Sequence, residues 1–344
     1  MRICVLCSAP GLDAGDHRRD PSVHLPEYSW ESHTLTRAGS VHEVRALAER
    51  GFDVFVNLCD GARGEDRAGV EVVQTLQRLG VAYTGADEAF YEPTREAMKA
   101  ACRARGVATP RAVFAADLAA AARAGEILRF PLIVKHPCSY SSVGMTRASR
   151  VEDREQLLAQ AARTIASYGR ALIEEFIEGR EFTVLVAENP ADRQRPIAFV
   201  PAEFGFPPGE CFKHHDLKWV DYHQMTWAPV LEPQLAARLQ DISRKQFLGL
   251  GGRSYGRCDI RMDSRGELYM LEINPNCGVF YAPEDPGSAD VILLADRAGH
   301  RGFLELILQA AVQAAARKRG GDPRQRQQRQ QRRRPALAVA AEVG

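Results

Sequence analysis

The sequence has no apolar run that approaches a membrane-spanning helix, which needs about 20 residues. Its first eight residues are apolar only briefly, and Pro10 and Gly11 then break the run. We therefore expect a buried first strand at this end and no signal peptide. These absences predict a cytoplasmic location and no membrane partner.

The eight cysteines lack the spacing of a metal site or a redox motif. Only Cys4 and Cys7 are separated by two residues, and in a strand they would point to opposite faces. Cys138, Cys258 and Cys277 lie within motifs, but the sequence shows no partnered base that would make any of them a nucleophile. We expect the thiols to be small apolar side chains in a reducing compartment.

Positive charge gathers near the end of the sequence, although the net charge is only +1. Residues 317–334 carry nine Lys or Arg against Asp322 alone, with 36 basic and 42 acidic residues before them. This stretch is rich in Gln and has no apolar periodicity, so we expect a basic, disordered tail over residues 317–344. No aromatic residue lies between the arginines, which argues against base stacking and predicts no specific nucleic-acid partner.

Hydrophobic residues make up 45% of the chain and charged residues 26%, as in an ordinary soluble enzyme. Strand and helix patterns alternate in residues 1–90, which predicts a small α/β module at the N-terminus. Residues 10–30, rich in Gly, Asp, Pro and His, are expected to form a long loop over the site. Residues 91–180 predict a central module, and residues 181–316 a C-terminal module in which helices flank hairpin strands. The fold class we expect is α+β with α/β character.

The most informative segment is a predicted hairpin over residues 257–274. Polar and apolar residues alternate through Arg257, Asp259 and Arg261, which is the two-residue period of a strand. The sequence Asp-Ser-Arg-Gly at 263–266 is typical of a turn, and a return strand follows it.

A loop of two or four residues in this hairpin would pair Arg257 with Glu272 and Asp259 with Met270. Side-chain parity then places Arg257, Asp259, Glu272 and Asn274 on one side of the sheet. Two carboxylates and an amide oxygen beside an arginine suit a hard cation that meets anionic substrates, and Mg²⁺ prefers such oxygen ligands.

The alternative interpretation is a surface hairpin with an Arg–Glu cross-strand pair. The apolar opposite face of the hairpin, and the sharp turn expected from Pro-Asn-Cys-Gly at 275–278, favour a functional site instead.

Glu-Ile-Asn at 272–274 followed by Gly278, with Arg257 and Asp259 upstream, resembles the carboxy-terminal signature of ATP-grasp ligases, most closely the D-alanine–D-alanine ligase group. The resemblance extends over roughly residues 57–315. Its further motifs are Gly-Glu-Asp at 64–66, Val-Lys-His-Pro-Cys-Ser-Tyr-Ser-Ser-Val-Gly-Met at 134–145, Leu-Ile-Glu-Glu-Phe-Ile-Glu-Gly-Arg-Glu-Phe-Thr-Val at 172–184, and Lys218-Trp219. The resemblance implies an ATP-grasp fold of three modules, with ATP held between the central and C-terminal ones. It also implies an ADP-forming ligase that activates a carboxylate as an acyl phosphate.

Lys135 ends an apolar strand and precedes a loop of small residues, whose backbone N–H groups are a way to hold phosphates. No Gly-Lys-Ser/Thr opens a helix here, so this is not a Walker motif. The resemblance implies that Lys135 and Ser142 bind phosphate and that Ser141 takes part in catalysis. It also implies that Lys218 lies on a mobile loop that closes over the γ-phosphate, where Lys213 could join it.

The segment after residue 171 looks like the hinge that lies along adenine in these enzymes. The resemblance implies that it binds the cofactor through the residues Glu174, Glu175, Phe176, Ile177 and Glu181, the last of which accepts from ribose hydroxyls. An edge strand with an acidic face and a helix are the alternatives, and Gly179 argues against the helix.

The resemblance assigns the metal to Asp259, Glu272 and Asn274, with two Mg²⁺ ions expected and Mn²⁺ as an alternative. Arg257 and the N–H of Gly278 would stabilise the oxyanion of the tetrahedral intermediate.

The sequence departs from the family pattern in the first module and ahead of the central one. Thr94-Arg95 replaces an Asp-Lys pair, so Arg95 keeps the positive charge for the phosphate with another geometry. The glutamate that orients the first D-alanine is missing from the N-terminal turn, and Glu27 or Glu31 could substitute only from a different loop.

Two more departures lie in the expected substrate pockets. Trp219 stands where a tyrosine hydroxyl helps bind the first amino acid. A longer segment at 280–290 replaces the one that receives the second substrate's carboxylate, and its Glu284, Asp285 and Asp290 would repel that carboxylate unless Ser288 or a main-chain amide compensates.

The substrates are therefore expected to be a small amino acid and a carboxylate. D-alanyl-D-alanine synthesis for peptidoglycan is the nearest activity, and another pair in a specialised pathway is the first alternative. A nucleotide-binding module without catalysis and a phosphotransferase or carboxylase of the same fold are further alternatives. A homodimer is an open expectation from the resembling group.

Overall fold

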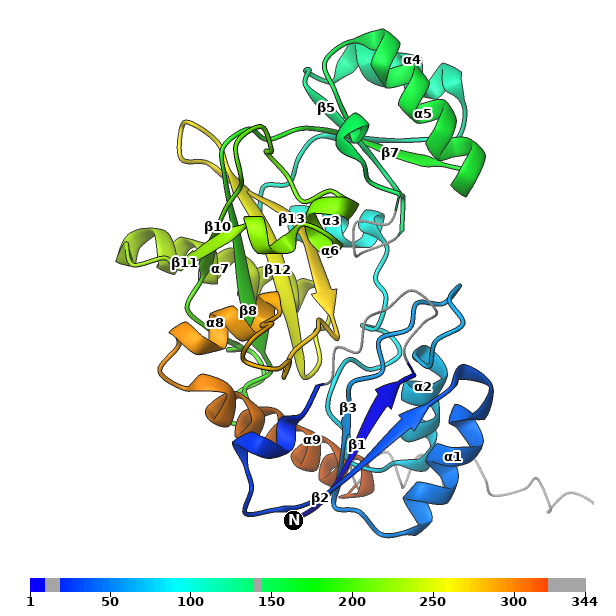
Figure 1. Cartoon of the computed structure of the whole chain (residues 1–344), viewed down its shortest axis with the longest axis vertical. Helices are drawn as coiled ribbons and strands as arrows, with labels where there is room; N and C mark the ends of the chain where they lie inside the picture. Colours follow the sequence, from blue (N-terminus) through cyan, green and yellow to red (C-terminus); the bar gives the residue numbers. More distant parts are fainter. Residues whose placement is uncertain (10–18, 139–143, 321–344) are drawn as a thin grey trace, which may run out of the picture.

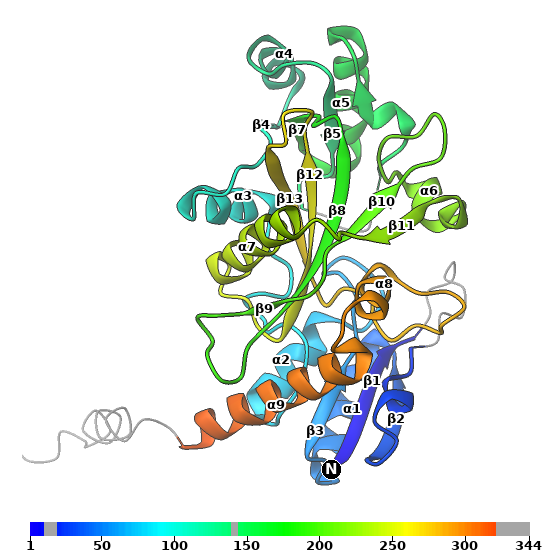
Figure 2. The same cartoon turned by 90° about the vertical axis from the view of Figure 1, so that its left-hand side faces the viewer.

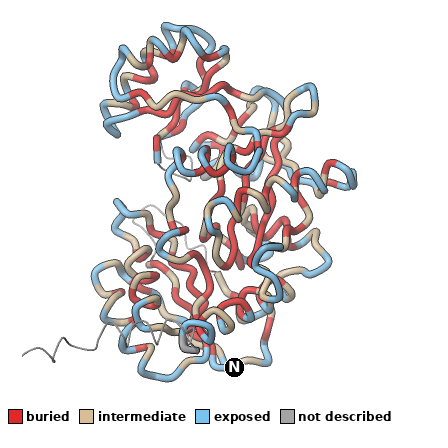
Figure 3. The backbone as a smooth tube through the Cα atoms, turned by 180° about the vertical axis from the view of Figure 1, so that it is seen from behind, coloured by how far each residue is buried: buried red, intermediate tan, exposed pale blue. Residues whose placement is uncertain are grey.

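The computed structural model describes residues 1–9, 19–138 and 144–320 of the chain. Three separate sheets follow one another along the long axis of the molecule (Figures 1 and 2). A small parallel sheet lies at the bottom of Figure 1, the largest sheet in the middle, and a small antiparallel sheet at the top. Helices pack on all three, and the strands are the most buried part of the chain (Figure 3).

The N-terminal sheet has the order β2-β1-β3 and is parallel. Strands β1 and β3 are almost wholly apolar because helices and neighbouring elements cover both of their faces. Strand β2 begins at the end of the long loop expected over residues 10–30 and continues past it. Its residues are mostly polar and half-exposed, so the sequence pattern did not predict a strand there. The elements are β1 (Arg2–Ser8), η1 (Pro21–His24), β2 (Ser29–Leu35), α1 (Arg37–Glu49), β3 (Val54–Asn57) and α2 (Val70–Leu79).

The sheet at the top of Figure 1 has the order β4-β7-β5-β6 and is antiparallel. Helices α4 and α5 cover one of its faces through an alanine- and leucine-rich core, and aspartates cap both helices. The elements are α3 (Arg95–Ala104), β4 (Ala112–Ala115), α4 (Leu118–Ile127), β5 (Leu132–Lys135), η2 (Arg147–Ser149), β6 (Arg150–Val151), α5 (Arg154–Tyr168) and β7 (Ala171–Glu175).

The middle sheet has the order β11-β10-β8-β12-β13, and β9 adds to β8. Helix α7 packs on its apolar face, and the opposite face carries polar side chains. The elements are β8 (Arg180–Ala187), β9 (Ile197–Ala198), β10 (Ala202–Gly205), α6 (His215–Trp219), η3 (Tyr222–Gln224), β11 (Thr226–Pro229), α7 (Pro233–Gly249), β12 (Tyr255–Met262), β13 (Leu268–Pro275), α8 (Ser288–Ala295) and α9 (Gly299–Gly320).

The predicted register of the β12–β13 hairpin is wrong by two residues beside the site. Arg257 pairs with Asn274 and Asp259 pairs with Glu272. A five-residue loop shifts the pairing by one, and a bulge next to Asp259 leaves Leu271 without a partner and shifts it by one more. The two shifts together preserve parity, so the four polar residues still share one face as predicted.

Helix α9 continues to Gly320, so the first residues of the expected disordered tail are helical. Residues 321–344, which hold most of that tail, lie outside the described residues. Among the helices in the described part of the chain, none combines the length and apolar character that crossing a membrane requires.

Candidate active site

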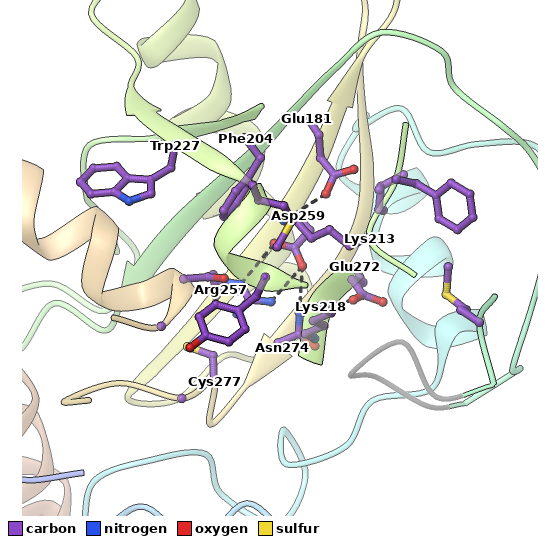
Figure 4. A pocket seen from close by; sticks show the side chains of 18 of the residues that line it. Glu181, Phe204, Lys213, Lys218, Trp227, Arg257, Asp259, Glu272, Asn274 and Cys277 are labelled. Carbon is purple, nitrogen blue, oxygen red and sulfur yellow. Dashed lines mark hydrogen bonds and ion pairs between the residues drawn. The ribbon is translucent and has the colours of Figure 1, made fainter. Parts of the chain in front are cut away.

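A cavity of about 500 Å³ lies between the small antiparallel sheet and the polar face of the middle sheet (Figure 4). Every predicted site residue that the structure describes lines it, namely Arg95, Lys135, Glu174, Glu175, Phe176, Ile177, Glu181, Lys218, Arg257, Asp259, Glu272, Asn274 and Gly278. Ser141 and Ser142 lie outside the described residues.

Three oxygen-bearing side chains meet at the end of the hairpin. The Nδ2 of Asn274 lies 3.2 Å from Oδ2 of Asp259 and 3.4 Å from Oε1 of Glu272. Amide oxygen and nitrogen are interchangeable by a flip of the side chain, which would turn Oδ1 of Asn274 toward the same point. Two carboxylates and an amide oxygen then converge, and this donor set fits a hard divalent cation such as Mg²⁺.

Arg257 binds the Asp259 carboxylate in a bidentate manner. Its Nε lies 3.2 Å from Oδ1 and its Nη2 lies 3.0 Å from Oδ2, while Thr183 donates to Oδ1 at 2.9 Å. Burial alone would raise the pKa of Asp259, but the charges of Arg257 and Lys213 outweigh it and hold the pKa well below its ordinary value. Asp259 is therefore ionised and ready to bind a cation.

Glu174 of β7 is buried between two lysines. Its carboxylate oxygens lie 2.6 Å from Nζ of Lys99 and 2.8 Å from Nζ of Lys135. Burial favours a raised pKa, yet the charges of Lys135, Lys99 and Arg95 hold the pKa of Glu174 well below its ordinary value. The ionised carboxylate therefore fixes the ammonium of Lys135 in the cavity wall.

Helix α3 brings Arg95 and Lys99 to this wall. The hydroxyl of Thr94 accepts from the N–H of Ala97 at 3.1 Å and begins the helix, so residues four apart share its inner face. Nη2 of Arg95 lies 2.6 Å from Oε2 of Glu272. Sequence reasoning missed Lys99, although its spacing from Arg95 on a capped helix could have identified it.

Lys218 lies on the short helix α6. The ring of His214 caps this helix by accepting from the N–H of Leu217 at 3.3 Å, and the N–H of His215 donates to the carbonyl of Met145 at 3.0 Å. Desolvation, helped by the charge of Arg257, lowers the pKa of Lys218 to about 8. The mobility expected of this segment stays a prediction.

An apolar recess lies at the end of the cavity formed by the small sheet. Phe176 and Phe212 meet edge to face with 5.9 Å between their centroids, and Ile133 and Met145 complete the cluster. The Glu175 carboxylate is bound by Arg129 and Arg111, outside this cluster. The recess has the apolar character that a planar base requires.

The other end of the cavity is lined mostly by polar and aromatic residues of three segments, together with one methionine, namely Asp60, Tyr222, His223, Met225, Trp227, Tyr281, Glu284, Asp285 and Ser288. Sequence reasoning missed Trp227 because it lies on a short edge strand whose pattern gave no signal. Trp219 also falls in this region of the sequence, but its side chain lies outside what the structure describes.

The expected roles of Glu27 and Glu31 are wrong. Glu27 is bound by Arg301 at 2.5 Å, Glu31 is bound by Arg50 and His33, and neither lines the cavity. Asp60 is the cavity-lining carboxylate that the described N-terminal module supplies.

Asp290 is buried away from the cavity lining and repels no substrate. It accepts from the N–H groups of Phe280 and Gly287 at 2.8 and 3.0 Å, and from His300 at 2.8 Å. Its role is to hold the loop that precedes α8.

Comparisons with known proteins agree with this geometry. Residues 109–282, half of the chain, match the family model described as D-ala D-ala ligase C-terminus. The chain is 31% identical over 241 residues to a D-alanine–D-alanine ligase of Xylella fastidiosa, covering 68% of this chain and 75% of that protein. It is 32% identical over 245 residues to the enzyme of that name from Xanthomonas axonopodis pv. citri, covering 68% and 72%.

Solved structures show the same fold at low identity. D-alanine–D-alanine ligase from Bacillus anthracis complexed with ATP matches with a TM-score of 0.65 at 19% identity, covering 93% of this chain and 100% of that one. VanG D-Ala:D-Ser ligase from Enterococcus faecalis matches with a TM-score of 0.68 at 15% identity, covering 90% and 99%. The expected ATP-grasp fold is confirmed, and the chain belongs to the D-alanine–D-alanine ligase family of ATP-grasp ligases.

Proposed function

We propose that the protein joins an amino acid's amine to a carboxylate, forming an amide and releasing ADP from ATP. One observation carries this proposal. Arg257, Asp259, Glu272 and Asn274 share one face of the hairpin, and the amine of Lys135 lines the same cavity from the opposite sheet. This arrangement provides oxygen ligands for a metal and cations for phosphate within one enclosure.

The residues suit acyl-phosphate chemistry. An amine cannot displace an oxide ion from a carboxylate, because oxide is a poor leaving group. The carboxylate must therefore first accept the γ-phosphoryl group of ATP. Lys135 and Lys218 would hold that group in line with the carboxylate. Asp259, Glu272 and Asn274 would hold Mg²⁺, which neutralises phosphate charge when bound. The chemistry requires no covalent nucleophile from the protein.

Charge on the tetrahedral intermediate would be stabilised by Arg257 and the main-chain N–H of Gly278. A Cβ atom at position 278 would collide with the ring and hydroxyl of Tyr281. Glycine at this position therefore allows the Tyr281 side chain to pack directly against the turn.

The substrate end supports a pair other than two D-alanines as the second candidate. Among the described residues lining the cavity, the lysines and arginines come from α3, α6, the small sheet and the segments around the metal ligands, while Glu284 and Asp285 lie on the loop before α8. A second substrate with a free carboxylate would meet two like charges there, whereas an amine without that carboxylate would not.

The test is Mg²⁺-dependent ADP release with D-alanine alone, followed by panels of D- and L-amino acids, their amides and other carboxylates, with products identified by mass spectrometry. A dipeptide from D-alanine would establish D-alanyl-D-alanine synthesis. Turnover only with another pair would keep the mechanism and replace the substrates, and absence of ADP with every pair would contradict the proposal. The expected homodimer and cytoplasmic location stay predictions, which light scattering and cell fractionation test.

A further inference from the structure

Three residues form a row across the floor of the cavity. Glu181 of β8 pairs with Arg261 of β12 on one side and with Phe204 of β10 on the other. Directly opposed residues in antiparallel strands point to the same face, so these side chains stand next to one another. Figure 4 shows Glu181 and Phe204 on this floor with Lys213 between them.

Lys213 reaches the row from the segment that precedes α6. Its Nζ lies 3.0 Å from Oε1 of Glu181 and 3.4 Å from the centroid of the Phe204 ring. Nη1 of Arg261 lies 3.4 Å from the other oxygen of Glu181 and donates to the carbonyl of Cys211 at 2.9 Å. One side-chain contact and one main-chain contact therefore fasten this segment to the Glu181–Arg261 pair.

The same segment carries Lys218. The side chain of His214 both caps α6 and pairs with Glu210 at 3.0 Å, so a compact turn joins Lys213 to the helix. Such a turn has little conformational freedom, because the His214 ring is held both by its cap bond to Leu217 and by its contact with Glu210. The position of Lys213 on the sheet therefore sets the position of Lys218 above the metal ligands.

Glu181 can hold this segment and a ribose together. A carboxylate offers about four acceptor positions, and Lys213 and Arg261 occupy two of them. Two remain for neighbouring hydroxyls. The side chain is only 7% exposed, so it has few alternative orientations once both cations are bound.

We propose that Lys213 is a positioning residue that couples recognition of the ribose hydroxyls to the placement of Lys218. The hydroxyls fix the Glu181 carboxylate, the carboxylate holds Lys213, and Lys213 holds α6 over the phosphates. This inference rests on the proposed function, because it takes the nucleotide in the cavity to be ATP.

The first experiment compares ATP with 2′,3′-dideoxy-ATP in Lys213→Met, which removes the charge and keeps most of the chain length. We expect kcat/KM for ATP to fall about tenfold, since one charge-assisted contact is lost. The dideoxy nucleotide, already poorer, should lose less than about twofold more, because the two changes act on one coupled network.

The matched control is Lys245→Met, which removes a surface pair with Asp241 and should leave both rates unchanged. Lys213→Arg keeps the charge and should recover most of the rate. An equal loss for the two nucleotides in Lys213→Met would show a merely structural lysine and overturn the proposal.

The second experiment reads the segment without turnover. Hydrogen exchange of the amides in residues 212–219 is followed with Mg²⁺ and either nucleotide, in the absence of amino acid. ATP should slow exchange in the wild-type chain and in Lys245→Met, and dideoxy-ATP or Lys213→Met should abolish most of this protection. Equal protection by both nucleotides would overturn the coupling. Protection that needs the hydroxyls, without ADP release from any substrate pair, would keep the coupling and reject the ligase proposal.

Discussion

At the scale of single residues, the charges in the cavity occur as pairs. Arg257 binds Asp259, Arg95 binds Glu272, and the two lysines share Glu174. A buried charge without a partner is strongly destabilising, so each pair allows a charged group to remain inside the protein before any ligand arrives. A nucleotide and a metal would then exchange partners with groups that are already ionised.

Glu272→Ala tests the metal corner at this scale. We expect turnover to fall on the order of 100-fold or more, because a ligand between the other two is lost. Circular dichroism and the thermal midpoint would show that the chain still folds. Glu267→Ala, an exposed glutamate on the turn of the same hairpin, is the matched control and should keep full turnover. Unchanged turnover in Glu272→Ala would reject the assignment.

The pH dependence of the reaction tests Lys218. Its pKa is lowered to about 8, so the ammonium is charged below that pH and neutral above it. We expect kcat/KM for ATP to decline above about pH 8, because phosphate binding needs the cation. Lys218→Arg stays charged throughout this range, so its profile should lack the alkaline decline even if its rate is lower. A decline that persists in Lys218→Arg would belong to another group.

At the scale of elements, the sequence pattern of the β12–β13 hairpin predicted which residues share a face but not which residues pair across the two strands. Alternation identified the face that holds Arg257 and Asp259, because parity depends only on spacing along each strand. The register depended on the loop length and on a bulge at Leu271, which involves contacts that no local pattern records.

Three partly exposed strands, β2, β10 and β11, were not predicted, because their residues follow no clean alternation of polar and apolar side chains. β2 and β11 lie at the edges of their sheets, and β10 lies between β11 and β8. Phe204 and Trp227 lie opposite each other on two of these strands and both line the cavity. The sequence motifs therefore indicated the residues that we propose to bind nucleotide and metal, while much of the proposed substrate end became visible only in the fold.

Asp290→Ala tests the loop before α8. Three donors would lose their buried acceptor, so we expect the free energy of unfolding to fall by about 2–5 kcal/mol. Urea denaturation measures this. Asp241→Ala, which removes an exposed aspartate, should change stability by less than about 0.5 kcal/mol. A small effect of Asp290→Ala would mean that the loop is held by other contacts.

At the scale of the whole molecule, the site depends on how the sheets are placed together. The N–H groups of Gly85 and Ala86 donate to Ser254 and Asn276 at 2.9 and 2.7 Å, across 169 and 190 residues of sequence. The order of the modules could be predicted from strand and helix patterns. Their docking could not, because these hydrogen bonds and the apolar core shared by the N-terminal sheet and the C-terminal module join segments far apart in the chain.

The dependence of stability on acid pH tests a contact between segments far apart in the chain, the one between α3 and the small antiparallel sheet. Glu174 joins α3 to the small sheet through Lys99 and Lys135, and its pKa is held well below its ordinary value of 4.5. A depressed carboxyl pKa stabilises the fold above the unfolded value, and this stabilisation is lost as pH falls below it. Glu174→Gln should therefore lower the free energy of unfolding at pH 7 by about 3–5 kcal/mol, since it leaves two buried lysines without a counter-charge.

The deficit of Glu174→Gln should shrink steadily from pH 4.5 downward, because the wild-type chain loses its advantage there as the unfolded state takes up a proton. Urea denaturation between pH 7 and pH 3 measures the difference. Glu126→Gln removes an exposed pair with Arg154 from the same module and should show no such trend. A deficit of constant size across that range would mean that Glu174 contributes through packing and not through its charge.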